Sequence, residues 1–130
     1  MIRFEIPGEP VSKARPRHGK GNTYTPKKTK DYERLVRLSY LNAGGQLHEG
    51  AVSVTIAVWY QVTKSWSKKK KAEMIGKPHT YRPDLDNVIK SVLDGLNGTA
   101  WEDDAQVSKI RAGKHWYDGE PMTIVIVEEE

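Results

Sequence analysis

One stretch of alternating side chains constrains this chain more than any other feature. Between residues 51 and 62, large apolar side chains take every second position, namely Val52, Val54, Ile56, Val58 and Tyr60. A period of two is typical of a β-strand with one face in a core. Small and aromatic side chains such as Ala57 and Trp59 fill the positions between, so we expect both faces of this strand to be covered.

Three shorter segments follow the same rule. Alternating apolar residues predict strands over 1–7, 106–112 and 121–128. Residues 8–25 have no apolar period and several proline breaks, so this segment is expected to be a long loop, which in a small domain usually has a function.

Helical spacing predicts three helices. The first covers about 27–43, and Thr25-Pro26 before it supplies an N-cap and a proline suited to the first helical position. A short basic helix is expected over 67–76, capped by Ser65 or Ser67. The third follows Pro83 and ends near 97–98. Strands and helices mix without strict alternation, which predicts a single α+β (or irregular α/β) domain over 1–130 with a mixed β-sheet.

Composition excludes several classes of protein. Hydrophobic residues make up 37% of the chain and charged residues 29%, which indicates a globular domain. No apolar run is long enough to span a membrane and the first residues lack a signal-peptide pattern, so we expect a cytoplasmic protein with no membrane partner. Without cysteine the chain has no disulfide and no thiolate metal site, and a metal ion would need oxygen or imidazole ligands.

Positive charge gathers in two blocks. Residues 11–30 hold seven cations and no acid, and residues 64–82 hold seven cations and one acid, although the whole chain carries only +4. Such blocks suit a polyanion such as DNA, but a lysine run is also often a solvated face.

Acidic residues gather around the third helix. Asp84 and Asp86 lie two apart in a segment that Pro83 biases toward an extended path, so we expect their side chains to converge. Asp86 could equally serve as an ordinary N-cap. Asp103 or Asp104, after the helix has folded the chain back, could supply a third carboxylate.

Three carboxylates would form a hard oxygen site that suits Mg²⁺ or Mn²⁺, which can activate water and neutralise charge on a phosphate. Lys90 lies one helical turn after Asp86 and could stabilise a phosphate or a leaving oxygen. The simpler alternative for Lys90 is an ion pair with Asp86 or Asp94. These residues favour a metal-dependent nuclease.

The run Arg82-Pro83-Asp84-Leu85-Asp86-Asn87, followed by Lys90, Asp94 and Trp101-Glu102-Asp103-Asp104-Ala105-Gln106-Val107, resembles the RusA family of Holliday-junction resolvases. Weaker similarity covers Lys13-Ala14-Arg15-Pro16-Arg17 and Tyr24-Thr25-Pro26. The resemblance implies a homodimeric, Mg²⁺-dependent endodeoxyribonuclease that nicks four-way DNA junctions symmetrically in recombination and repair, often of prophage origin.

Carried over residue by residue, the resemblance makes Asp84, Asp86 and Asp104 the metal ligands and Lys90 the catalytic cation. Neighbours on an extended strand face opposite ways, so only one of Asp103 and Asp104 should enter the site, and the family pattern favours Asp104. For Asp94 a supporting hydrogen bond and a direct role remain open.

The basic residues are candidates for contacts with DNA phosphates; they are Lys13, Arg15, Arg17, Lys68, Lys69, Lys70, Lys71 and Arg82. Two other functions stay open, a catalytically silent DNA-binding protein and a metal nuclease acting on other branched DNA. The four histidines have no metal-ligand spacing and are expected at the surface. The four tryptophans are expected in the core or a dimer interface rather than stacked on bases.

Overall fold

A four-stranded mixed sheet forms the centre of the computed structural model, which describes residues 1–13, 17–19, 22–24 and 26–130. The strand order is β1-β6-β4-β5, in which β6 pairs antiparallel with both β1 and β4, and β5 pairs parallel with β4. The strands are β1 (Ile2–Pro7), β4 (Val52–Gln61), β5 (Val107–Tyr117) and β6 (Met122–Glu129). This sheet and its helices confirm the predicted α+β fold.

The alternating residues of β4 set the register of the whole sheet. Val54 lies opposite Val127 of β6 and Ile110 of β5, so these side chains share one face. On that face the β4 side chains Val52, Val54, Ile56, Val58 and Tyr60 are buried. The predicted strand over 51–62 is therefore the core strand of the protein.

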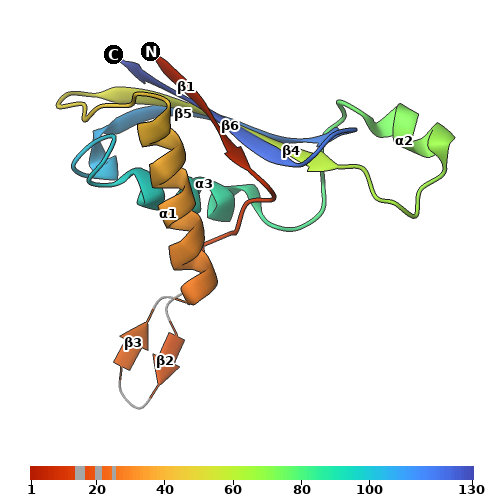
Figure 1. Ribbon diagram of the computed structural model, residues 1–130, viewed down its shortest axis with the longest axis horizontal. Helices are drawn as coiled ribbons and strands as arrows, with labels where there is room; N and C mark the ends of the chain where they lie inside the picture. Colours follow the sequence, from red (N-terminus) through yellow and green to blue (C-terminus); the bar gives the residue numbers. More distant parts are fainter. Residues whose placement is uncertain (14–16, 20–21, 25) are drawn as a thin grey trace.

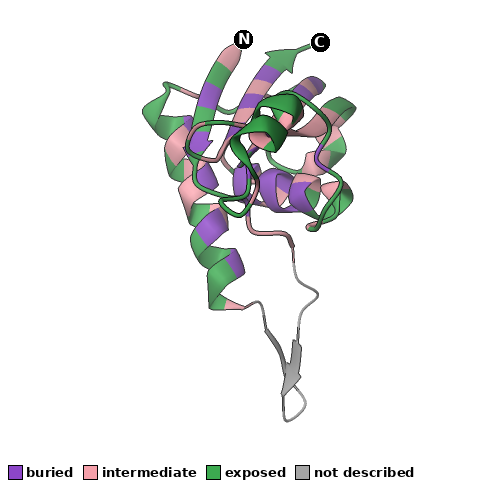
Figure 2. Ribbon diagram, turned by 90° about the vertical axis from the view of Figure 1, so that its right-hand side faces the viewer, coloured by how far each residue is buried: buried purple, intermediate pink, exposed green. Residues whose placement is uncertain are grey.

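Two helices cover this face, α1 (Lys27–Asn42) and α3 (Leu85–Leu96), and α2 (Lys68–Met74) lies beyond the end of the sheet (Figure 1). Figure 2 shows α3 buried over much of its length. The two large helices cross closely at Gly95, where an added Cβ would lie 2.9 Å from the Cβ of Val36. Only glycine fits that crossing without displacing α1.

The opposite face of the sheet differs from the prediction. None of the described helices packs on it (Figure 1), and its apolar side chains, among them Trp59, Ile124 and Ile126, are only partly buried. The expectation that both faces are covered is wrong, because small and aromatic residues between core positions are equally compatible with an open face.

Smaller differences concern the ends of elements. The strand predicted over 106–112 continues to Tyr117, because β5 keeps pairing with β4 from Lys109 to Tyr117. Within the segment expected to be loop, β2 (Arg17–Gly19) and β3 (Asn22–Tyr24) pair as a short antiparallel hairpin. Pro26 occupies the N-cap position of α1, and Thr25, predicted as the cap, lies outside the described residues.

The capping of α2 agrees with the sequence. Ser67 is its N-cap and accepts a hydrogen bond from the backbone N–H of Lys70. None of the helices in the described part of the chain is long and apolar enough to cross a membrane.

Candidate active site

Two aspartates stand at the N-terminal end of α3. Asp84 is the N-cap residue in extended conformation, yet its side chain makes no capping hydrogen bond, and Asp86 lies in the first helical turn. The alternative that Asp86 is the cap is therefore wrong, as is the expectation that both lie in one extended segment. Both residues are exposed, and the Asp86 carboxylate accepts a hydrogen bond from the Asn87 N–H at 3.0 Å. This end of α3 presents two carboxylates to solvent.

A lysine on β5 holds the segment that leads into α3. The Lys114 Nζ donates to the backbone carbonyls of Tyr81 and Pro83, both at 2.7 Å. Sequence reasoning missed Lys114 because it lies beyond the predicted end of the strand at residue 112. Lys114 lies two residues from both Ala112 and Trp116 and so shares their face of β5, and this spacing is the signal that could have placed it on the helix-covered face.

The middle of α3 carries an ion-pair cluster. Asp94 lies 3.4 Å from the Lys90 Nζ and 3.1 Å from the Lys13 Nζ, and Lys13 also lies 3.4 Å from Glu33 of α1. Partial burial acts to lower the pKa of Lys13, but its hydrogen bond to Asp94 and the charges of Glu33 and Asp94 outweigh that effect and raise the pKa.

This cluster bears on two predicted roles. Two carboxylates already share the Lys13 ammonium, which argues against a phosphate contact by that residue. Lys90 does make the simple ion pair with Asp94, but its side chain stays 57% exposed, so it remains accessible to a ligand.

The C-terminal end of α3 leads into a tightly bonded turn. Trp101 is fully buried and its Nε1–H donates to the Asn97 side chain at 2.7 Å. The Gln106 amide donates to the carbonyls of His48 and Gly50, at 2.9 and 3.0 Å. The Trp and Gln of the family-like motif thus fix the backbone on either side of the acidic pair.

Asp103 and Asp104 lie in this turn rather than on the expected strand. Asp103 caps the 3₁₀ helix Asp104–Gln106 by accepting from the Ala105 N–H at 3.1 Å. Asp104 is half-buried, and none of the side-chain hydrogen bonds between described residues uses its carboxylate. The strand argument for Asp104 is therefore wrong in its geometry, and the capping role of Asp103 leaves Asp104 as the freer carboxylate.

One chain does not bring the three predicted metal ligands together. Asp84 and Asp86 precede or begin α3 and Asp104 follows it, and the twelve residues of the helix span about 18 Å. Among the described residues, no three carboxylate or imidazole side chains gather closely enough to hold a metal ion. A single chain thus fits a hard divalent cation only in part, with two oxygen donors at one end of α3 and one at the other.

The predicted DNA contacts fall in different surroundings. Lys68, Lys69 and Lys70 are exposed on α2, and Lys71 is half-buried. The Lys70 ammonium lies 4.6 Å from the centre of the Trp66 ring, a cation–π contact. Arg82 is exposed just before Asp84. Arg15 and the side chain of Arg17 lie outside what the structure describes.

The expected burial of the histidines and tryptophans is only partly confirmed. His79 is buried rather than at the surface, packed in an aromatic cluster with Tyr60 and Trp116. Trp101 and Trp116 are core residues, as expected.

Comparison with known proteins decides the family. A sequence model of the family Endodeoxyribonuclease RusA matches residues 7–128, nearly the whole chain. This chain belongs to the RusA endodeoxyribonuclease family. It is also 35% identical to the uncharacterized protein YqaN of Bacillus subtilis (strain 168), over 98% of this chain and 96% of that protein. Membership of the RusA family confirms the resemblance found in the sequence and supports a nuclease that acts on DNA.

Proposed function

We propose that this chain is a Mg²⁺-dependent endonuclease that resolves four-way DNA junctions by paired nicks, as a homodimer. The observation that carries the proposal is the pair of exposed carboxylates at the start of α3 in a member of the RusA family. Asp84 makes no capping hydrogen bond, which argues against a catalytically silent protein whose acids only cap helices.

The metal ligands in this proposal are Asp84, Asp86 and Asp104. When bound, Mg²⁺ or Mn²⁺ would activate water and neutralise charge that develops on the phosphate. The exposed Lys90 lies on the same helix face as Asp86, one turn later, and would stabilise negative charge on the phosphate or the leaving oxygen. Asp94 keeps the Lys90 side chain over that face as a positioning residue.

The separation of these ligands along α3 supports the proposed homodimer. If a two-fold axis passes near the middle of α3 and perpendicular to it, the helices of two chains run antiparallel, so Asp104 of one chain approaches Asp84 and Asp86 of the other. Ile110, on the helix-covered face of the edge strand β5, is 42% exposed and would be buried by such packing. A four-way junction needs two nicks related by symmetry, and a two-fold dimer has two sites.

DNA would be held by the exposed cations. We assign phosphate contacts to Lys68, Lys69, Lys70 and Lys71 of α2 and to Arg82 beside the carboxylates, with Arg15 and Arg17 as further candidates. Such contacts carry position rather than sequence information.

The test uses labelled four-way, flap and linear duplex DNA, with and without Mg²⁺. The wild-type chain should convert four-way junctions into two nicked duplexes only with the metal, and Asp84→Asn should bind junctions equally well without cutting them. Asp118→Asn, an exposed acid in the turn before β6, is the control and should cut normally. Cleavage without a divalent metal, or near-normal cleavage by Asp84→Asn, would refute the proposed metal site. Faster cleavage of flaps than of four-way junctions would refute the four-way junction as the substrate.

A further inference from the structure

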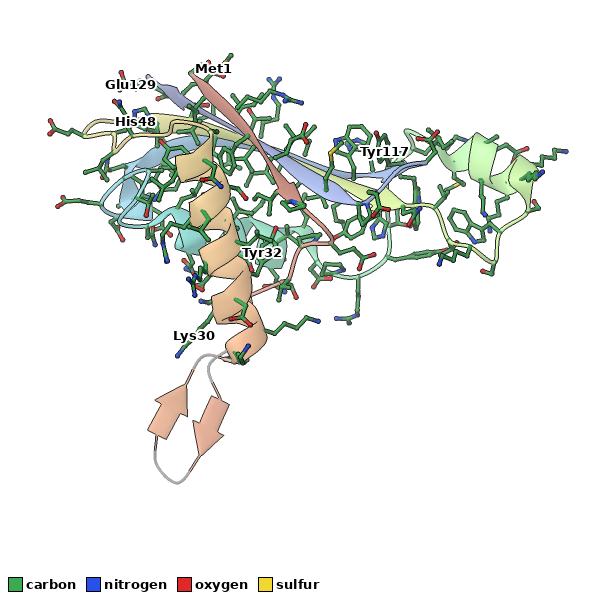
Figure 3. All side chains as sticks on the ribbon, viewed as in Figure 1. Met1, Lys30, Tyr32, His48, Tyr117 and Glu129 are labelled. Atoms are coloured by element: carbon green, nitrogen blue, oxygen red, sulfur yellow. The ribbon has the colours of Figure 1, made fainter. Side chains whose placement is uncertain are left out.

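A pocket lined by aromatic rings lies directly beside the acidic end of α3. Its volume is about 190 Å³, and Arg82 and Pro83, the two residues before Asp84, form part of its wall. Tyr60 and Gln61 at the end of β4 and Trp116 near the end of β5 form another part. Tyr117, labelled in Figure 3, marks this end of the sheet, and the α3 carboxylates have no part in the lining.

The inner wall is a fixed stack of rings. The rings of Tyr60 and His79 are stacked with centres 4.0 Å apart and planes 19° apart, and Trp116 packs on His79 at 4.4 Å. Tyr81 meets Trp116 edge-on at 5.6 Å, yet it is 56% exposed. Buried rings thus hold one exposed ring in place beside the pocket, an arrangement that suits a flat aromatic guest.

Two buried polar atoms in this wall are left without a side-chain partner in the described part of the chain. The Tyr60 hydroxyl and the His79 Nδ1 are buried, and neither has a hydrogen-bond partner among the described residues. Buried polar groups are nearly always bonded, so each such atom can take a partner that enters the pocket. Gln61 and Arg82 add an amide and a guanidinium to the same pocket.

The protonation states of the two buried groups are suited to hydrogen bonding. Burial, with the charge of Glu9, raises the pKa of Tyr60, so the hydroxyl keeps its proton. Burial, with the charge of Lys114, lowers the pKa of His79, so the imidazole is neutral at physiological pH. A neutral ring and a phenol together offer both donors and acceptors.

We propose that this pocket receives one unpaired nucleobase of the DNA, next to the cleaved phosphate, and that Tyr60 and His79 read its edge. A base has a flat aromatic face for the rings and a polar edge for the two buried atoms. At a branch point bases unstack at lower cost than in a duplex. The pocket would thereby set the sequence preference of cleavage, an inference that rests on the proposed nuclease function.

The test compares Tyr60→Phe with Tyr32→Phe. Both tyrosines are almost fully buried, but Tyr32 does not line the pocket. On four-way junctions that differ in one base beside the nick, the ratio of fastest to slowest cutting should fall about five- to tenfold in Tyr60→Phe. Tyr32→Phe should keep the wild-type ratio. An unchanged ratio in a folded Tyr60→Phe would overturn the proposal.

Two further measurements test the base pocket independently of the Tyr60→Phe variant and of cleavage. Gln61→Leu changes an exposed pocket residue, so it reduces the ratio even if Tyr60→Phe does not fold, and an unchanged ratio for both would count against the pocket. A junction with 2-aminopurine beside the nick should brighten when the wild type binds it without metal, and less so with Tyr60→Phe. Brightening without any cleavage in Mg²⁺ would reject the nuclease function while retaining the base pocket, and no brightening with normal cleavage would do the reverse.

Discussion

The two ends of α3 are built in opposite ways. At the N-terminal end, Asp84 and Asp86 are exposed and Lys114 holds only the backbone before them. At the C-terminal end, the buried Trp101 and the two hydrogen bonds donated by the Gln106 amide fix the turn around Asp104. The N-terminal end is open to a ligand, and the C-terminal end has a fixed backbone. This difference suits the proposed dimer, in which Asp104 of one chain completes the metal site that Asp84 and Asp86 of the other chain begin.

The largest effect should come from mixing two inactive variants. Asp84→Asn and Asp104→Asn should each be inactive alone, but a mixed dimer would place both substitutions in one site and leave the other intact. With random exchange, half the dimers are mixed, so about a quarter of the wild-type nicking sites should return. Nicking assays after subunit exchange measure this, with single nicks predominating over paired ones.

The matched control mixes Asp84→Asn with Asp86→Asn. Both residues belong to the same end of α3 in one chain, so every site in a mixed dimer keeps one substitution and no activity should return. Recovery in this control, or none in the first mixture, would mean that the carboxylates are not shared between chains as proposed.

A smaller contrast separates the two acids of the fixed end. Asp104→Asn should lower the nicking rate by about 100-fold or more because it removes a metal ligand. Asp103→Asn should leave nicking nearly intact and lower the free energy of unfolding by at most about 1 kcal/mol, since asparagine caps almost as well as aspartate. Nicking rates and chemical denaturation report the two effects. A greater loss of nicking in Asp103→Asn would reverse the assignment.

The smallest effects concern the hydrogen bonds that hold each end. Lys114→Met should speed amide hydrogen exchange over residues 81–87, and Gln106→Leu should speed it over 101–106, each with a loss of about 1–2 kcal/mol of stability. Exchange followed by mass spectrometry locates the change. If either variant loosened both ends equally, the ends would not be independent.

Much of the fold could be predicted because the strongest patterns are local. The alternation of β4 and the helical spacing of α1 and α3 depend on which residues must be buried, and burial dominates their free energy. The length of β5 and the uncovered sheet face could not be predicted, since they depend on pairing and packing with distant segments.

The candidate site shows the same division. The motif picked out Asp84, Asp86 and Lys90, whose placement needs only the start of one helix. The prediction placed Asp104 on an extended strand. In the structure Asp104 lies in the turn between α3 and β5, because β5 begins only at Val107. Lys114 and the pocket around Tyr60 depend on tertiary contacts that no local pattern encodes.

The strand order also dictates when the protein can become a nuclease. The strand β6 lies between β1 and β4, yet it is the last of the four to be synthesised. Until residues 122–129 have left the ribosome, β1 has no partner and β4 lacks its antiparallel neighbour, although α3 and its acids were made some 30 residues earlier. The timing of translation itself therefore keeps a half-made chain from forming a complete sheet beneath its acidic helix.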